Sequence, residues 1–342
     1  MSEVEWEQDE YVTVLLAADG DGSSAGDANK TTPTRRDACL LRLDCARGNE
    51  TYTDDRSEWR RGIERARATA AEVRGVLQCT GVSEGASGAE AADGKVNWLR
   101  RAVLYEDEDF VALDKPAGMY TESILQGMER YPWRVADTTT LTTVRLLHRL
   151  DRDTSGVLLF GKTRLASQLW SNAIRGRSGV VDKRYATVLE VSADAAGTYS
   201  ASRALLSGST VRVCSGHGRA ASGLHRMYPY EWCGRILHER MRHPVRYAES
   251  WFRRADADPP PQADLWRMRA WCKPLTGRTH QIRLHAHALQ MPIVGDARYG
   301  HLHSAVQYCI HWLHAERLVL SLPSGRRWSV RSPLPSWWHS CA

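Results

Sequence analysis

Apolar residues in this chain group into short runs rather than long segments, most clearly after residue 98. Six of these runs are rich in β-branched, aromatic and other apolar residues and are typical of β-strands. The predicted strands are 103–105, 110–113, 157–160, 185–191, 266–273 and 318–322. Apolar residues three to five positions apart predict helices at 163–175, where Leu165, Leu169 and Ile174 share a face, and at 280–289. Because strands and helices are mixed without regular β–α–β alternation, the pattern predicts an α+β fold.

The N-terminal part of the chain has a weaker pattern. Residues 1–37 start acidic and continue rich in Gly, Ser, Ala, Asp and Thr, so we expect a mostly disordered tail with one short strand at 12–17. Residues 38–97 are predicted to be an extension of unknown fold with one basic helix at 55–78. This extension ends in a linker-like stretch at 81–94.

The remaining residues, 98–342, are predicted to form one domain. Within it, the segment 203–263 is Arg-rich, lacks a regular apolar period and ends in three consecutive prolines before residue 262. We therefore expect this segment to be an irregular insertion on the surface. A length of 342 residues accommodates such a domain together with a smaller N-terminal region.

Composition and charge narrow the function. Apolar residues make up 42% of the chain and charged residues 25%, proportions that exclude a wholly disordered or fibrous protein. The net charge is +6, although the first 30 residues hold eight acidic side chains and one lysine. The rest of the chain is therefore strongly basic, which favours a polyanionic partner such as nucleic acid.

Other features restrict the compartment and the chemistry. No apolar run is long enough for a membrane helix, so no membrane partner is expected. The acidic N-terminus lacks the zones of a secretory signal, which predicts a cytoplasmic or nuclear protein and leaves an organelle such as the mitochondrion open. The eight cysteines include no CxxC pair, and the histidines between 301 and 314 fit no standard metal spacing. We therefore expect reduced thiols, structural histidines and no metal site.

The strongest candidate for catalysis is the segment 148–156, just before a predicted buried strand. Asp151 lies between Arg149 and Arg152 in the sequence, and nearby positive charges favour an ionised carboxylate. Such a carboxylate is a candidate nucleophile or base. The alternatives are a surface salt-bridge loop and a metal site made with Asp153, although the arginines would compete with a cation.

Two further segments place polar residues at the ends of predicted elements. Tyr185 follows two basic residues at the head of a strand, where a tyrosine is usually a core residue with its hydroxyl at the rim. In the segment 274–285, Thr279 is placed to cap the predicted helix and Arg283 lies one turn further on. Helix N-termini and arginines both bind phosphates, but a basic surface helix has the same pattern.

Together these segments resemble the RluA-type RNA pseudouridine synthases, from about Leu104 to the C-terminus. Segment 148–156 is similar to the signature with the family's catalytic aspartate, 183–185 to its tyrosine motif, and 276–283 to its third motif. Further similar segments, in the family's order, are 114–118, 292–296, 299–300 and 313–315. The departures are the insertion and the N-terminal region, which does not match the small RNA-binding domain that many relatives carry.

The resemblance implies a mixed, mostly antiparallel sheet with a central RNA-binding cleft. It also implies an isomerase that converts uridine in structured RNA to pseudouridine without a metal, cofactor or energy source. By resemblance, Asp151 is the nucleophile or base, acting on either the sugar or the uracil ring, and Tyr185 stacks on the target base. Arg283 would keep Asp151 ionised, and Arg149 would fill the gap left when the uridine flips out of the RNA.

The resemblance assigns four more residues to RNA binding or base flipping: Lys115, Arg278, His280 and Ile282. The expected partner is ribosomal or transfer RNA, including RNA in ribosomal assembly particles, and we expect a monomer. The alternative function is an RNA-binding assembly factor that retains the fold, for example in ribosome biogenesis. A third hypothesis, a metal-dependent hydrolase using two aspartates of segment 148–156, predicts that activity requires a divalent cation.

Overall fold

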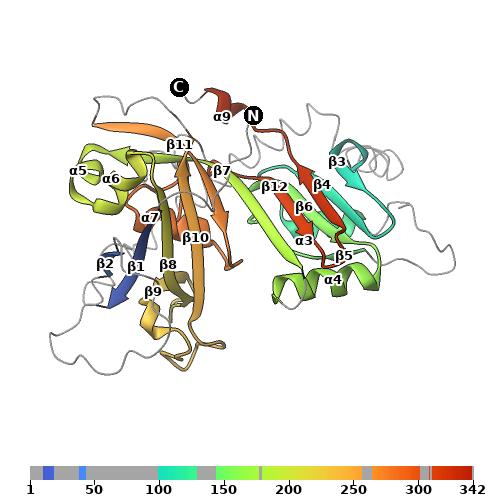
Figure 1. Cartoon of the computed structure of the whole chain (residues 1–342), viewed down its shortest axis with the longest axis horizontal. Helices are drawn as coiled ribbons and strands as arrows, with labels where there is room; N and C mark the ends of the chain where they lie inside the picture. The colour runs from blue at the N-terminus through green and yellow to red at the C-terminus, as the bar shows by residue number, and fades with distance from the viewer. Residues whose placement is uncertain are drawn as a thin grey trace.

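A single large sheet organises the molecule (Figure 1). The computed structural model describes residues 11–18, 38–43, 99–128, 144–176, 179–255, 264–300, 308 and 310–340. Across the sheet the strands are β2 (Ala38–Leu43), β1 (Tyr11–Ala18), β8 (Thr210–Arg219), β10 (Arg246–Arg254), β11 (Leu265–Pro274), β7 (Val180–Ser192), β12 (Leu313–Ser321), β6 (Ser155–Gly161), β4 (Phe110–Lys115) and β3 (Val103–Glu106). Beside this row, β5 (Arg145–Leu146) pairs with β6, β9 (His225–Tyr228) with β8, and β13 (Arg327–Arg331) with β12.

Most of the strand pairs are antiparallel. The parallel pairs among the described strands are β1 with β2, β1 with β8, and β12 with β6. The helices are α3 (Thr121–Met128), α4 (Arg164–Ile174), α5 (Ala193–Thr198), α6 (Ser200–Leu206), α7 (Gln281–Ala288) and α9 (Ser336–Ser340), with a 3-10 turn η1 (Tyr230–Trp232). The predicted α+β class with a mostly antiparallel sheet is confirmed.

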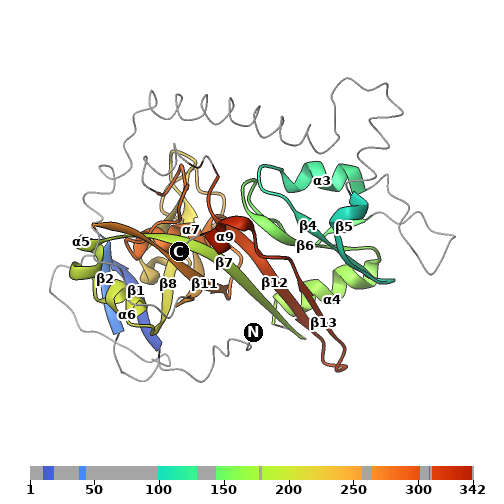
Figure 2. The same ribbon diagram turned by 90° about the horizontal axis from the view of Figure 1, so that it is seen from above.

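At the β6–β4 end, helices cover both faces of the sheet. Figure 2 shows α3 and α4 on opposite sides of β4 and β6. The strand sequences explain this, because successive side chains of a strand point to opposite faces. On β4, Val111 and Leu113 join the apolar cluster that includes α3, whereas Phe110 and Ala112 join the one that includes α4.

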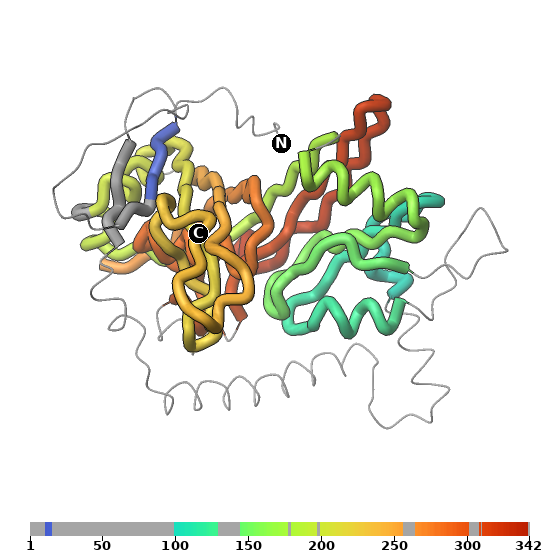
Figure 3. Tube along the Cα trace, turned by 90° about the horizontal axis from the view of Figure 1, so that it is seen from below, coloured from blue at the N-terminus to red at the C-terminus, as the bar shows by residue number. Residues whose placement is uncertain are grey.

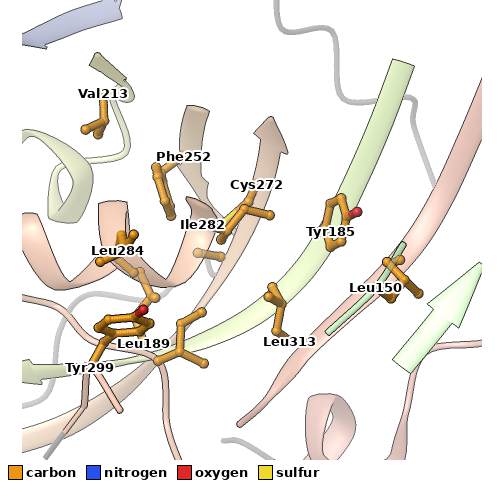
Figure 4. Packing of buried hydrophobic residues seen from close by; sticks show 14 of the residues in the cluster. Leu150, Tyr185, Leu189, Val213, Phe252, Cys272, Ile282, Leu284, Tyr299 and Leu313 are labelled. Carbon is orange, nitrogen blue, oxygen red and sulfur yellow. The ribbon is translucent and has the colours of Figure 1, made fainter. Parts of the chain in front are cut away.

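The larger apolar cluster continues to the other end of the sheet. It takes in Val213 on β8, Phe252 on β10 and Leu284 on α7 (Figure 4), together with Leu205 on α6. All four side chains are fully buried. This continuous core fixes α7 against the strands, and α7 carries residues of the third motif.

Helix α4 presents a different face to the sheet from the one predicted. The buried residues are Ala166, Trp170 and Ala173, while Leu165 and Ile174 are 54% and 51% exposed. The buried set keeps helical spacing but is centred on Trp170, with an alanine about one turn to either side. The prediction gave weight to the large aliphatic residues and missed the stripe of small residues around the tryptophan.

The expected irregular insertion at 203–263 is wrong for much of its length. It contains β8 and β10, which lie inside the sheet between β1 and β11. Val211 and Val213 are buried on either side of the partly exposed Arg212, which pairs with Glu249 of β10, so an arginine within an apolar run is held by a partner in the sheet. The irregular part is shorter and lies around β9 and η1.

The predicted strands at 103–105, 110–113, 157–160, 185–191 and 266–273 are confirmed within β3, β4, β6, β7 and β11. The strand at 318–322 falls in β12, but β13 follows it, so it is not the last. The short strand at 12–17 lies within β1, which joins the main sheet through β8. The predicted helix at 55–78 and linker at 81–94 lie outside the described residues. None of the described helices is long and apolar enough to cross a bilayer.

The packing of α4 yields a stability prediction. We expect Trp170→Ala to lower the free energy of unfolding by about 3–5 kcal/mol, because it leaves a cavity against the sheet. Leu165→Ala, on the same helix, should change it by less than about 0.5 kcal/mol because that side chain is half exposed. Urea unfolding followed by circular dichroism checks both. Equal losses for the two variants would contradict the assigned face.

Candidate active site

Asp151 lies in a loop between β5 and β6 that neighbouring elements hold in place. The Lys115 ammonium, at the end of β4, donates to the carbonyl oxygens of Arg152 and Pro116 at 2.8 Å each. The Thr121 hydroxyl, at the start of α3, donates to the carbonyl oxygen of Leu150 at 3.0 Å. The backbone on both sides of Asp151 is therefore fixed by buried side chains from two other elements.

The third support of this loop comes from the segment that leads into β12. Thr154 Oγ1 lies 2.8 Å from His311 Nε2, and Ser155 Oγ lies 2.8 Å from His314 Nδ1. Gly156 has a φ of 105°, and a Cβ there would overlap the carbonyl oxygen of Ala315. The glycine therefore allows β6 and β12 to approach closely just after the catalytic candidate.

Arg283 reaches this loop from α7. Its Nη1 donates to Asp151 Oδ2 at 3.0 Å, as the resemblance implied. Its Nε and Nη2 donate to the two carboxylate oxygens of Asp296 at 2.7 Å each. The Asp296 carboxylate also accepts the backbone N–H groups of Arg298 and Tyr299. One buried guanidinium thus joins two carboxylates, and the second of them holds it in a fixed orientation.

Asp296 was not among the predicted site residues. It lies in the similar segment 292–296, to which the resemblance assigned no role. A signal was present, because a single acidic residue ends the otherwise apolar stretch 291–295. Asp296 is almost completely buried, and a buried carboxylate requires a charged or hydrogen-bonded partner.

The charges of the site are set by this network. Burial alone would raise the pKa of Asp151, but the Arg283 charge and hydrogen bond, with smaller contributions from His280 and His311, hold the pKa below its usual value. Burial likewise opposes the ionisation of Asp296, and Arg283 again holds that pKa well below its usual range. Both carboxylates are therefore ionised at neutral pH.

Tyr185 stands on β7 in the same apolar cluster as Leu150, the residue before Asp151 (Figure 4). Burial raises the pKa of its hydroxyl, and the negative charge of Asp151 raises it further. The phenol is therefore neutral at physiological pH. Ile282, next to Arg283 on α7, packs in this cluster as well.

His280 begins α7 with a left-handed backbone, at a φ of 57°. It takes the cap position that was predicted for Thr279, and its side chain makes no capping hydrogen bond. Its Nε2 lies 3.8 Å from Asp151 Oδ2, and its Nδ1 lies 2.8 Å from the Tyr299 hydroxyl. Burial lowers the pKa of His280 to about 3, so the ring is neutral.

Two of the remaining predicted residues have structural contacts. Arg278 donates from Nε to the carbonyl oxygen of Tyr247 at 2.9 Å. Lys115 is fully buried, and its ammonium contacts the two carbonyl oxygens of the Asp151 loop. Its side chain is therefore inaccessible and supports the Asp151 loop, so the predicted role of Lys115 in RNA binding stays a prediction and would act through that loop.

Arg149 points to the surface. Its guanidinium pairs with Glu122 at 2.9 Å, and the two side chains are 73% and 52% exposed. An ion pair this exposed contributes little to stability, so Arg149 is available to other partners. Among the described residues, no group of three or more His, Cys, Asp or Glu side chains is arranged to hold a metal.

Comparison with known proteins finds relatives of one family. The family model described as RNA pseudouridylate synthase matches residues 109–288. "RNA pseudouridine synthase 1" of Oryza sativa subsp. japonica is 31% identical over 267 residues, which are 69% of this chain and 73% of that protein. "Ribosomal large subunit pseudouridine synthase C" of Rickettsia prowazekii is 27% identical over 245 residues, 67% of this chain and 68% of that protein.

Among solved structures, "Human RNA Pseudouridylate Synthase Domain Containing 4" aligns with a TM-score of 0.49 and 19% identity, over 72% of this chain and 94% of that one. The family match spans more than half of the chain and includes Asp151, Tyr185 and Arg283. The chain belongs to the RNA pseudouridylate synthase family. It is therefore an isomerase that acts on RNA.

The charge network predicts the acidic limb of the pH–rate profile. If activity requires ionised Asp151, it falls as pH drops through the pKa of that carboxyl, which Arg283 keeps low. With Arg283→Gln, burial acts without opposition, so the limb should move to higher pH by about one to three units. Single-turnover tritium release from uracil-labelled RNA between pH 4 and 8 measures this shift.

Two further variants control this measurement. Arg283→Lys keeps the positive charge and should show a smaller shift, whereas Arg327→Gln removes an exposed arginine on β13 and should show none. An acidic limb in Arg283→Gln that coincides with that of the wild type would disprove the role of this ion pair.

Proposed function

We propose that Asp151 initiates the conversion of a uridine in structured RNA to pseudouridine. The observation that carries this proposal is an ionised carboxylate, 3.0 Å from a buried arginine, in a loop fixed by three other elements. The reaction breaks the bond between uracil N1 and ribose C1′ and forms a bond from C5 to the same carbon. The C5 proton leaves and N1 gains one, so the reaction needs no net change in charge or oxidation state.

Asp151 supports both routes that begin this reaction. Attack on the sugar and attack on the uracil ring each need a carboxylate that is ionised before the base arrives. Arg283 provides that state, and the Asp296 carboxylate keeps Arg283 from turning away. Preorganised charges of this kind do not have to reorient during the reaction.

Tyr185 is proposed to stack on the target base. Its aromatic ring lies in the apolar cluster beside the Asp151 loop, which gives the uracil a flat partner. Because burial and Asp151 keep its hydroxyl protonated, Tyr185 enters the reaction as a hydrogen-bond donor rather than as a base.

Arg149 is proposed to occupy the space that the flipped uridine leaves in the RNA. The glycosidic bond is shielded in a stacked helix, so the nucleotide must turn out before Asp151 can reach it. Arg149 is two residues from Asp151 in the sequence, is largely exposed and is held only by a surface pair with Glu122. A planar guanidinium can stack between bases when it leaves that pair.

For the target we propose ribosomal RNA in preference to transfer RNA. The support is the relative whose name specifies the ribosomal large subunit. The compartment of this protein would then be one that contains ribosomal RNA, and the proposed active form is a monomer. Pseudouridine sequencing of total RNA, with and without the protein, identifies the modified position. A position found only in transfer RNA would reverse this preference.

Substitution of Asp151 tests the catalytic assignment. We expect Asp151→Asn to lower turnover by at least about three orders of magnitude, because the side chain keeps its size and loses its charge. RNA affinity in a filter-binding titration should stay within about twofold of the wild type.

Asp153→Asn is the matched control for that substitution. It makes the same chemical change two residues away, where the carboxylate pairs with Arg152 at 2.7 Å rather than with Arg283. We expect it to retain most of the activity. Appreciable turnover by Asp151→Asn would refute the assignment and favour the RNA-binding assembly factor.

The base-flipping role of Arg149 predicts a dependence on RNA structure. Arg149→Ala should lose about tenfold or more in single-turnover rate on a stem-loop, since flipping costs a few kcal/mol and 1.4 kcal/mol is about tenfold. On an unstructured RNA of the same sequence around the target, the loss should be small. Glu122→Ala removes the other half of the exposed pair and should leave both rates unchanged. Equal losses of Arg149→Ala on the two RNAs would eliminate the flipping role.

A further inference from the structure

Basic side chains from three separate segments meet beside the catalytic carboxylate. Arg219 ends β8, and it lies directly opposite His225, the first residue of β9, in the antiparallel register. Arg298 belongs to the turn after Asp296. Its neighbour Tyr299 donates from its hydroxyl to the carbonyl oxygen of His225 at 3.2 Å. The hairpin and the turn are therefore joined at His225.

The same contacts connect these residues to Asp151. The ring of His225 is 5.3 Å from that of His217 and 5.7 Å from that of His280, measured between centroids. His280 in turn lies 3.8 Å from the Asp151 carboxylate. Of these three histidines, His225 has a buried Nδ1 that finds no hydrogen-bond partner among the described residues. Because buried ring nitrogens are usually hydrogen-bonded, this nitrogen is a candidate donor to a bound group.

Arg219 and Arg298 are exposed, and neither side chain pairs with a carboxylate in the part of the chain that the structure describes. Arginines elsewhere do pair, as Arg184 does with Glu316. Burial lowers the pKa of His225, and the charges of Arg219 and Arg298 lower it further while Asp151 opposes them. The histidine is thus held neutral between two free cations.

The charge at His225 favours an anion. Arg283 is shared by the carboxylates of Asp151 and Asp296, whereas Arg219 and Arg298 place two further positive charges near His225. A phosphodiester group beside His225 would offset part of that charge. Arginine is also the side chain best suited to phosphate oxygens, because its donors match their geometry.

We propose that Arg219, His225 and Arg298 bind a phosphodiester of the RNA backbone beside the target uridine. This inference rests on the proposed function in one respect: Asp151 marks where the reacting nucleotide lies. Phosphate contacts carry no sequence information but set the register of a nucleic acid on a protein. The site would therefore decide which nucleotide of the bound strand faces Asp151.

The basic surface extends away from this site along the segment 219–246. That segment holds six arginines and two glutamates. Figure 3 shows its yellow and orange trace projecting from the sheet. It supplies a path along which further phosphates of the same strand can lie.

Salt-dependent binding of a uridine 12-mer tests the proposal. We expect Arg219→Gln/Arg298→Gln to weaken binding about tenfold at low salt. The slope of log affinity against log salt should also fall by about 0.7, since one phosphate contact to a single strand contributes about that much. Arg219→Lys/Arg298→Lys keeps both charges and should restore most of the slope. Filter binding over a range of salt concentrations supplies both quantities.

Arg164→Gln/Arg327→Gln is the matched control, because it removes two exposed arginines from α4 and β13. It should leave affinity and slope near the wild-type values. His225→Phe keeps an aromatic ring beside His217 and His280 and removes the ring nitrogens. It should weaken binding with an unchanged slope. An Arg219→Gln/Arg298→Gln slope equal to that of the control, or a wild-type affinity independent of salt, would overturn the site.

This test is separable from the test of catalysis. All of these titrations can be repeated in the Asp151→Asn background, where no turnover is expected and only binding is measured. If Asp151→Asn turned over RNA, the catalytic assignment would fail while the binding result stood. If the slope did not change, the phosphate site would fail while the role of Asp151 stood.

Discussion

The active site depends on one buried guanidinium that two carboxylates share. Arg283 would be costly to bury alone, and so would Asp151 or Asp296. Together they satisfy one another, and in doing so they bring three segments to one point: α7, the loop before β6 and the turn after residue 295. Asp296 is the inaccessible partner and Asp151 the accessible one, so the first anchors the arginine and the second remains open to a substrate. Removal of Arg283 would leave its two carboxylates without a cation, and an uncompensated buried charge typically costs about 3–5 kcal/mol.

The titratable groups around this ion cluster are held in one protonation state near neutral pH. Burial lowers the pKa of His280 to about 3 and that of His311 to about 4, so both rings are neutral. The two carboxylates are ionised and the Tyr185 phenol is not. The site therefore presents a fixed pattern of charge, with an anion at Asp151 and a neutral donor at Tyr185, before any RNA arrives. Such a pattern suits a reaction in which the protein contributes position and electrostatics.

The sequence predicted most elements and motifs formed by neighbouring residues, and few of the contacts between residues far apart in the chain. The strands 110–113, 157–160 and 266–273 have clear apolar patterns, and the motifs around Asp151 and Arg283 are contiguous in the chain, so both were predicted. The Asp296 partner was missed because no local pattern links it to an arginine 13 residues earlier. Strands β8 and β10 were read as surface because arginines break their apolar runs, and only the sheet shows how those arginines are accommodated, as Arg212 is by its ion pair with Glu249 of the neighbouring strand. On α4, tertiary packing selected Trp170 and two alanines over larger aliphatic side chains.

The close approach of Gly156 to Ala315 has a consequence for how the chain reaches its native state. Asp151 meets Arg283 across 132 residues of sequence, and β6 gains its parallel neighbour only when β12 has been made. A nascent chain that has been synthesised only as far as β6 therefore contains the Asp151 loop without the contacts that His311, His314 and Arg283 make to it. Contacts of such long range form slowly, and an unpaired strand edge is a template for the wrong partner. Loss of the C-terminal strands through a premature stop codon would accordingly do more than shorten the protein, since it would leave the middle of the sheet open to aggregation.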